Sequence, residues 1–221
     1  MSATVVSRPA GSQPVGDSIV RLGACVALIA WFVLVVGLGV RGAFIGRSGT
    51  PPVAMAVGFA APLLLFFAGL GISRPFRQFV LSLDLRLIAG VQAWRCAGFG
   101  FLALYAHAIL PGTFALPAGL GDIAIGFAAP WIVLALVRRP GFAASRWFVG
   151  WNVLGVLDLA VAVILGAVGA ALTTGAPGEI STAPLATLPL LLIPAYFVPL
   201  FIMLHAAALM QSRRVSRGQA G

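Results

Sequence analysis

The sequence predicts an all-α integral membrane protein, a bundle of about six transmembrane helices with both termini in the cytoplasm. Three observations predict this class. The chain is 61% hydrophobic and only 9% charged, with a mean hydropathy of +1.07, whereas soluble domains carry roughly 25% charged residues. The apolar residues form long uninterrupted runs such as 24–40, unlike the short alternating segments of barrel strands. Short gaps separate these runs, and three of the five gaps contain arginine.

The predicted elements follow these runs along the chain. Residues 1–17 contain Ser, Pro and Gly with few large apolar side chains, so we expect a disordered cytoplasmic segment. The membrane domain then occupies 18–211, and 212–221 form a basic cytoplasmic tail. Each run is about the 20 residues needed to cross a bilayer. The predicted spans are about 19–40, 53–72, 87–110, 114–137, 147–171 and 186–210.

Two connections have recognisable sequences. Residues 74–86 mix arginines with large apolar side chains, which predicts a short helix on the membrane surface. Leu110-Pro111-Gly112-Thr113 contains two helix-breaking residues, so the third and fourth spans should form an antiparallel pair joined by a tight turn.

The arginines predict the orientation. All fourteen basic residues are arginines. With six spans, only Arg41 and Arg47 lie on the side opposite the termini, and Arg95 lies within a span. Since arginine is enriched on the cytoplasmic side, both termini should be cytoplasmic. The net charge of +9 is scattered over these gaps, so we expect a lipid bilayer as the partner and no nucleic acid.

Three charged residues lie deep in predicted spans: Arg95, Asp122 and Asp158. A charge at the bilayer centre costs at least ~2.5–3.5 kcal/mol, so such residues normally pair or face water. Gln92 shares a helical face with Arg95, and both aspartates lie on stripes of small residues suited to helix contact. We therefore expect Arg95 to pair with Asp122, Asp158 or both.

Two roles for this intramembrane polar cluster stay open. It could only fix the packing of the helices, or it could bind a proton, ion or small solute. One arginine cannot neutralise two carboxylates, which favours a binding role.

Catalytic, metal and cofactor motifs are missing from the sequence, so we expect no enzyme, metal or cofactor. Cys25 and Cys96 lie in apolar runs without metal-ligand spacing. His107 is predicted near the outer end of the third span and His205 near the cytoplasmic end of the sixth. This separation in depth excludes a shared haem, and both are expected to be interfacial.

The sixth span and the residues just before it contain Pro184, Pro189, Pro194 and Pro199. Proline removes a backbone hydrogen bond and bends a helix. We expect a kink or break near Pro194 and Pro199, where freed carbonyls could also form a gate.

Several motifs together resemble a group of small bacterial multi-pass membrane proteins. They are Gln92-Ala93-Trp94-Arg95-x-x-Gly98, Leu110-Pro111 with Pro117-Ala118-Gly119-x-Gly121-Asp122, Trp151-Asn152-x-x-Gly155-x-x-Asp158, and Ile193-Pro194-x-x-x-x-Pro199 followed by His205. The resemblance implies a multi-pass fold in the bacterial inner (plasma) membrane and no particular activity. It adds Asn152 to the cluster residues.

The sequence thus predicts a carrier or binding protein for a proton, ion or small solute. The alternative is a non-catalytic accessory or assembly subunit whose partners are other membrane proteins. A carrier should contain a cavity that leads to the cluster, whereas an accessory subunit should be a closed bundle.

Overall fold

The computed structural model describes residues 15–219 and consists of helices and their connections over that range. The helices, in chain order, are α1 (Val15–Val40), α2 (Val53–Ile72), α3 (Arg74–Ser82), α4 (Leu85–Val91), η1 (Gln92–Gly98), α5 (Phe99–Ala106), α6 (Gly112–Arg138), η2 (Phe142–Ala144), α7 (Arg146–Leu172), η3 (Ala183–Ala186), η4 (Ile193–Phe197) and α8 (Val198–Gln219).

Six helical segments are long and apolar enough to cross a membrane, as predicted. The third is composite, since α4, the 3₁₀-helical η1 and α5 follow one another without a break from Leu85 to Ala106. The 3₁₀ segment winds more tightly than an α-helix, and it carries Arg95.

The ends of the bundle differ from the expectation. Most of the segment predicted to be disordered, 1–17, lies outside the described residues, but its last three residues already form the start of α1. At the other end, α8 continues through most of the basic tail 212–221, as far as Gln219.

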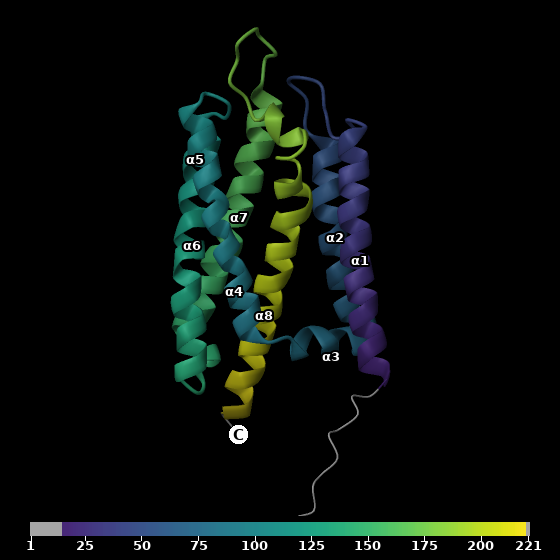
Figure 1. Ribbon diagram of the computed structural model, residues 1–221, viewed down its shortest axis with the longest axis vertical. Helices are drawn as coiled ribbons and strands as arrows, with labels where there is room; N and C mark the ends of the chain where they lie inside the picture. The colour runs from purple at the N-terminus through teal and green to yellow at the C-terminus, as the bar shows by residue number, and fades with distance from the viewer. Residues whose placement is uncertain (1–14, 220–221) are drawn as a thin grey trace, which may run out of the picture.

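The helices are arranged as a bundle in which α1 and α2 form a hairpin beside the remaining spans (Figure 1). The loops α1–α2, α5–α6 and α7–α8 lie at one end, which we call the loop end. The start of α1 and the end of α8 lie at the opposite end. There α3 runs across the bundle and connects the hairpin to α4.

The short helix predicted within 74–86 is present as α3; its place on the membrane surface stays a prediction. Ser73 begins it, because its side-chain oxygen accepts a hydrogen bond from the Phe76 amide at 3.3 Å. The next helix, α4, begins at Asp84, whose carboxylate accepts a bond from the Arg86 amide at 2.8 Å. The α2–α4 connection is therefore fixed by two successive helix caps.

The composite third span and α6 approach each other closely, because glycines face each other there. A Cβ atom added to Gly98 would lie 2.6 Å from the carbonyl oxygen of Gly119. One added to Gly126 would lie 2.6 Å from the backbone nitrogen of Cys96. The backbones are thus in contact, as the small-residue stripe of the fourth span predicted. The tight turn between them is also confirmed, with α5 ending at Ala106 and α6 beginning at Gly112.

The start of the sixth span was predicted wrongly. Residues 187–191 form turns, and continuous helix begins only about Leu192, close to Pro194. The reason is the prolines: Pro184 lies in the short η3, and Pro189 has no amide hydrogen for a helical bond. The membrane-crossing segment is therefore Ile193–Arg217, seven residues later in the chain than predicted.

Candidate functional site

The centre of the bundle holds the polar cluster that the sequence predicted. The Arg95 side chain is fully buried. Its Nε donates to Asp122 Oδ1 at 2.7 Å, and its Nη2 donates to Asp158 Oδ2. Arg95 from η1 therefore joins α6 and α7, and the predicted ion pairs are both present.

The same guanidinium also contacts α7 and α8. Its Nη1 donates to the carbonyl oxygen of Gly155 at 3.2 Å and lies 3.3 Å from His205 Nε2. Arg95 thus contacts four partners on three other helices, two of them carboxylates. These partners offset the cost of burying the guanidinium, because a buried charge is costly unless it is paired and hydrogen-bonded.

The hydrogen bonds of His205 determine its tautomer. A guanidinium has only donors, so His205 Nε2 must accept from Arg95 and carries no proton. The proton is then on Nδ1, which donates to Asn152 Oδ1 at 2.9 Å. Asn152 completes the chain by donating from Nδ2 to the Phe148 carbonyl at 2.8 Å. His205 is therefore neutral in this arrangement.

The expectation that His205 is interfacial was wrong. It is fully buried, and it lies at the middle of the Ile193–Arg217 segment, just as Arg95 lies near the middle of Leu85–Ala106. The error came from the misplaced start of the sixth span. Pro184 and Pro189 were the signal in the sequence that could have corrected it. His107, in contrast, is exposed at the end of α5.

Two other predicted site features have different outcomes. Gln92 is fully buried one turn before Arg95, but neither its side-chain nitrogen nor its oxygen has a hydrogen-bond partner among the described residues. The helix is irregular at the predicted place, since Pro194 lies in the π-helical η4 and Pro199 in the first turn of α8. A gating role for Pro194 and Pro199 stays a prediction.

Beside the cluster, the bundle contains a cavity of about 670 Å³. Asp122 is one of its lining residues, and 16% of that side chain is exposed. Along α7 the lining runs from Leu159 to Thr173, which corresponds to about 21 Å at ~1.5 Å per residue. The cavity therefore extends from the depth of the cluster to the loop end of the bundle.

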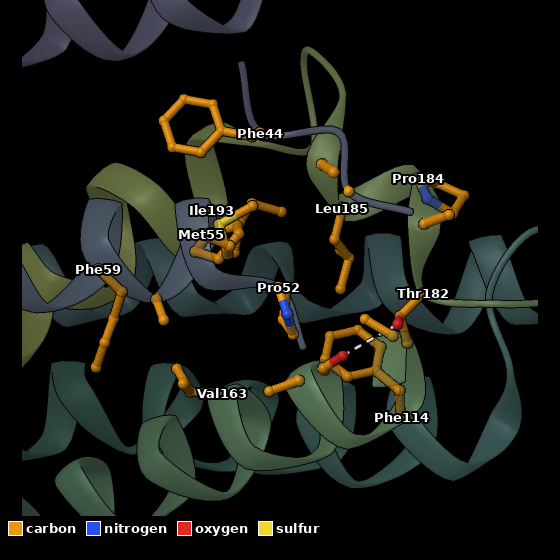
Figure 2. A pocket seen from close by; sticks show the side chains of 18 of the residues that line it. Phe44, Pro52, Met55, Phe59, Phe114, Val163, Thr182, Pro184, Leu185 and Ile193 are labelled. Carbon is orange, nitrogen blue, oxygen red and sulfur yellow. Dashed lines mark hydrogen bonds between the residues drawn. The ribbon is translucent and has the colours of Figure 1, made fainter. Parts of the chain in front are cut away.

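The walls of this cavity are mainly apolar and come from α2, α5, α6, α7 and η4 with the adjoining loops. In Figure 2, Phe59 of α2 and Val163 of α7 approach the space from opposite sides. The hydroxyl of Thr182, also in the wall, donates a hydrogen bond of 3.0 Å to the Gly166 carbonyl oxygen. On α7, Ala162 and Gly166 belong to the stripe of small residues predicted for helix contact, and here they leave space instead.

The loops at the cavity mouth are organised by Glu179. Its carboxylate accepts hydrogen bonds from the amides of Thr174, Gly175 and Ala176 and from the Thr174 hydroxyl, at 2.8–3.3 Å. The bond from the Thr174 amide is the first cause that lowers the pKa of Glu179 below its usual value. The loop so formed meets the α1–α2 loop, because a Cβ on Gly175 would lie 2.9 Å from Ser48 Oγ.

Comparison with known proteins gives one match. Residues 52–213 match the family model described as Domain of unknown function (DUF8737). The chain belongs to the DUF8737 family. No curated protein and no solved structure matches the chain. The DUF8737 region includes α2 to the greater part of α8, so it contains every residue of the polar cluster and most of the cavity wall, without the part from the α1–α2 loop.

Proposed function

We propose that this protein is a membrane carrier or binding protein for a small solute, which enters the cavity from the loop end and is held against Asp122. The observation that supports the proposal best is the extension of the cavity to Asp122, a carboxylate ion-paired to the fully buried Arg95. Its volume falls within the roughly 300–1,000 Å³ typical of small-molecule sites. A polar cluster that only joined helices would not need such an opening.

A proton is the natural second solute at this site. One guanidinium faces two carboxylates, and His205 is neutral, so the cluster has an excess of one negative charge when both aspartates are ionised. An uncompensated charge at this depth is costly. A proton or a cationic solute on Asp122 removes the excess, and exchange between the two would couple their movements.

We also propose that the protein lies in the bacterial inner membrane with both termini in the cytoplasm. The end opposite the loop end carries nine of the fourteen arginines, in α3, the start of α4, the adjoining ends of α6 and α7 with their connection, and the end of α8 (Figure 1). Only Arg41 and Arg47 belong to the α1–α2 connection, so the positive-inside rule supports this orientation.

Cysteine accessibility tests the proposal. In a chain with Cys25 and Cys96 replaced by alanine, Ala162→Cys places a thiol in the cavity wall. Ala129→Cys is the matched control, since Ala129 is fully buried at a helix contact. A water-soluble maleimide added from the side of the loop end should label Ala162→Cys and leave Ala129→Cys unlabelled.

The same maleimide added only from the other side should label neither variant. Equal protection of both variants from both sides would contradict a solute cavity. It would favour the accessory subunit, for which other membrane proteins would then be the partners.

A further inference from the structure

The cavity has a chemical character that narrows the class of its solute. Its lining includes four aromatic side chains and a single carboxylate: Phe44, Phe59, Phe101, Phe114 and Asp122. The aromatic faces carry partial negative charge and attract cations, as the carboxylate does. An apolar body with one positive charge would match both parts of this wall.

The carboxylate has an oxygen available for such a group. Asp122 uses Oδ1 for Arg95, and among the described side chains no donor is bonded to Oδ2. Asp122 is also the acidic group that contacts the cavity, whereas Asp158 is outside the lining. A solute cation would therefore meet Asp122 without displacing Arg95.

The charges around Asp122 also favour a positively charged solute. Arg95, Asp158 and the neutral His205 surround it from η1, α7 and α8, and together with Asp122 they sum to one negative charge. Arg47 is a cation in the lining, but it belongs to the α1–α2 loop at the mouth. The deep end of the cavity thus favours positive charge.

A bare metal ion fits this wall poorly. The described residues contain no group of three or more His, Cys, Asp or Glu side chains arranged to hold a metal. The cavity is also far larger than an ion and mostly apolar.

From these observations we infer that the solute is a lipophilic cation, a bulky apolar molecule with one positive charge that binds Asp122. This inference rests on the proposed function. When Asp122 is protonated, binding breaks its O–H bond, the proton leaves to bulk water, and the carboxylate retains the electron pair and faces the cation. Each cation that binds to this protonated form would thus release one proton.

Two probes of the same shape and opposite charge test the inference: tetraphenylphosphonium and tetraphenylborate. Binding to the purified full chain in detergent is measured by equilibrium dialysis, and proton release is measured in weak buffer. We expect tetraphenylphosphonium to bind, to release protons and to bind more weakly as the pH falls. Tetraphenylborate should bind at least about tenfold more weakly.

Three variants complete the test. Asp122→Asn keeps an oxygen for Arg95 Nε, and it should abolish proton release and weaken tetraphenylphosphonium binding by roughly tenfold or more. Asp84→Asn, the matched control, alters an acid outside the cavity and should change nothing. Gly166→Leu should fill the cavity without a backbone clash, because a Cβ added to Gly166 would lie at an ordinary contact distance of 3.6 Å from its nearest neighbour, Phe114.

The outcomes separate the inference from the proposed function. Suppose that both probes bind equally, that Gly166→Leu blocks both and that Asp122→Asn affects neither. The cavity is then a solute site, as proposed, but the assignment of a cationic solute is overturned. Preference for tetraphenylborate, lost in Arg47→Gln, would also overturn it, in favour of an anionic solute. If neither probe binds, the cation inference is overturned, and protection of Ala162→Cys from maleimide would then remove the proposed function as well.

Discussion

Replacing Arg95 by methionine should destabilise the protein severely. The substitution removes four buried hydrogen bonds, to Asp122, Asp158, Gly155 and His205, and leaves two carboxylates in an apolar bundle. Removing one partner of a buried ion pair costs about 3–5 kcal/mol. We expect a loss of that size in the free energy of unfolding, measured by reversible denaturation in mixed detergent micelles.

The triple variant with Arg95→Met, Asp122→Leu and Asp158→Leu should recover most of this loss. No charge is then stranded, and the main remaining cost is His205 Nε2 without its donor, roughly 1–3 kcal/mol. If the cluster binds the solute, this variant should fold and insert but neither bind nor transport. Full activity of a stable triple variant would show that the cluster only holds the helices together.

Arg86→Met provides the control for the single substitution. Arg86 also pairs with an aspartate, Asp84, at 2.8 Å, but the two side chains are 57% and 38% exposed. Exposed pairs contribute little, so the control should unfold like the wild type. An Arg95→Met variant within about 1 kcal/mol of the wild type would refute the reasoning about burial.

Three further predictions concern packing, pH and orientation. Gly126→Ala should weaken the contact of α6 with η1 and lower the melting temperature, because its Cβ would clash with backbone atoms. Gly100→Ala, the control, has open space around its Cβ and should be neutral. Equal melting temperatures for the two variants would contradict this. Because the pKa of Glu179 is lowered, the stabilisation that its carboxylate gives to the cavity mouth should be complete above its ordinary pKa of 4.5 and lost progressively as the pH falls below that value. At such low pH the Thr174 amide should be less protected from hydrogen exchange. In Glu179→Gln this amide should be poorly protected at every pH. A phosphatase reporter that is active only outside the cytoplasm should be active after Gly42 and inactive at the C-terminus, and equal activity at both sites would contradict the orientation.

Much of the fold could be predicted because the bilayer imposes simple constraints on the sequence. Helix length, the break at Pro111-Gly112 and the glycines that bring α6 against η1 are local features, and each is visible in a short segment. The pairing of Arg95 with Asp122 and Asp158 followed from the same reasoning, since buried charges need partners.

The cavity and the place of His205 could not be predicted in this way. The position of His205 depends on where the sixth helix starts, and hydropathy does not separate the apolar turns at 187–191 from the helix that follows. The cavity depends on which helices stay apart. Small residues such as Ala162 and Gly166 permit close contact, but α2, opposite α7, supplies Met55 and Phe59 around an open space instead.

The corner between α2 and α3 has a mechanical consequence for this space. Ser73 both ends α2, donating its amide to the Gly69 carbonyl at 2.9 Å, and begins α3. Phe66 and Phe76 pack edge to face across the corner, with ring centroids 5.9 Å apart. If α2 rotated as a rigid body about this corner by about 10°, its far end would move by about 5 Å, since the helix is about 30 Å long. The α2 residues that line the cavity run from Met55 to Ala60, about 27 and 20 Å from the corner, so the loop end would widen about 1.4 times as much as the deeper part. The polar cluster lies on η1, α6, α7 and α8, so its geometry would not change.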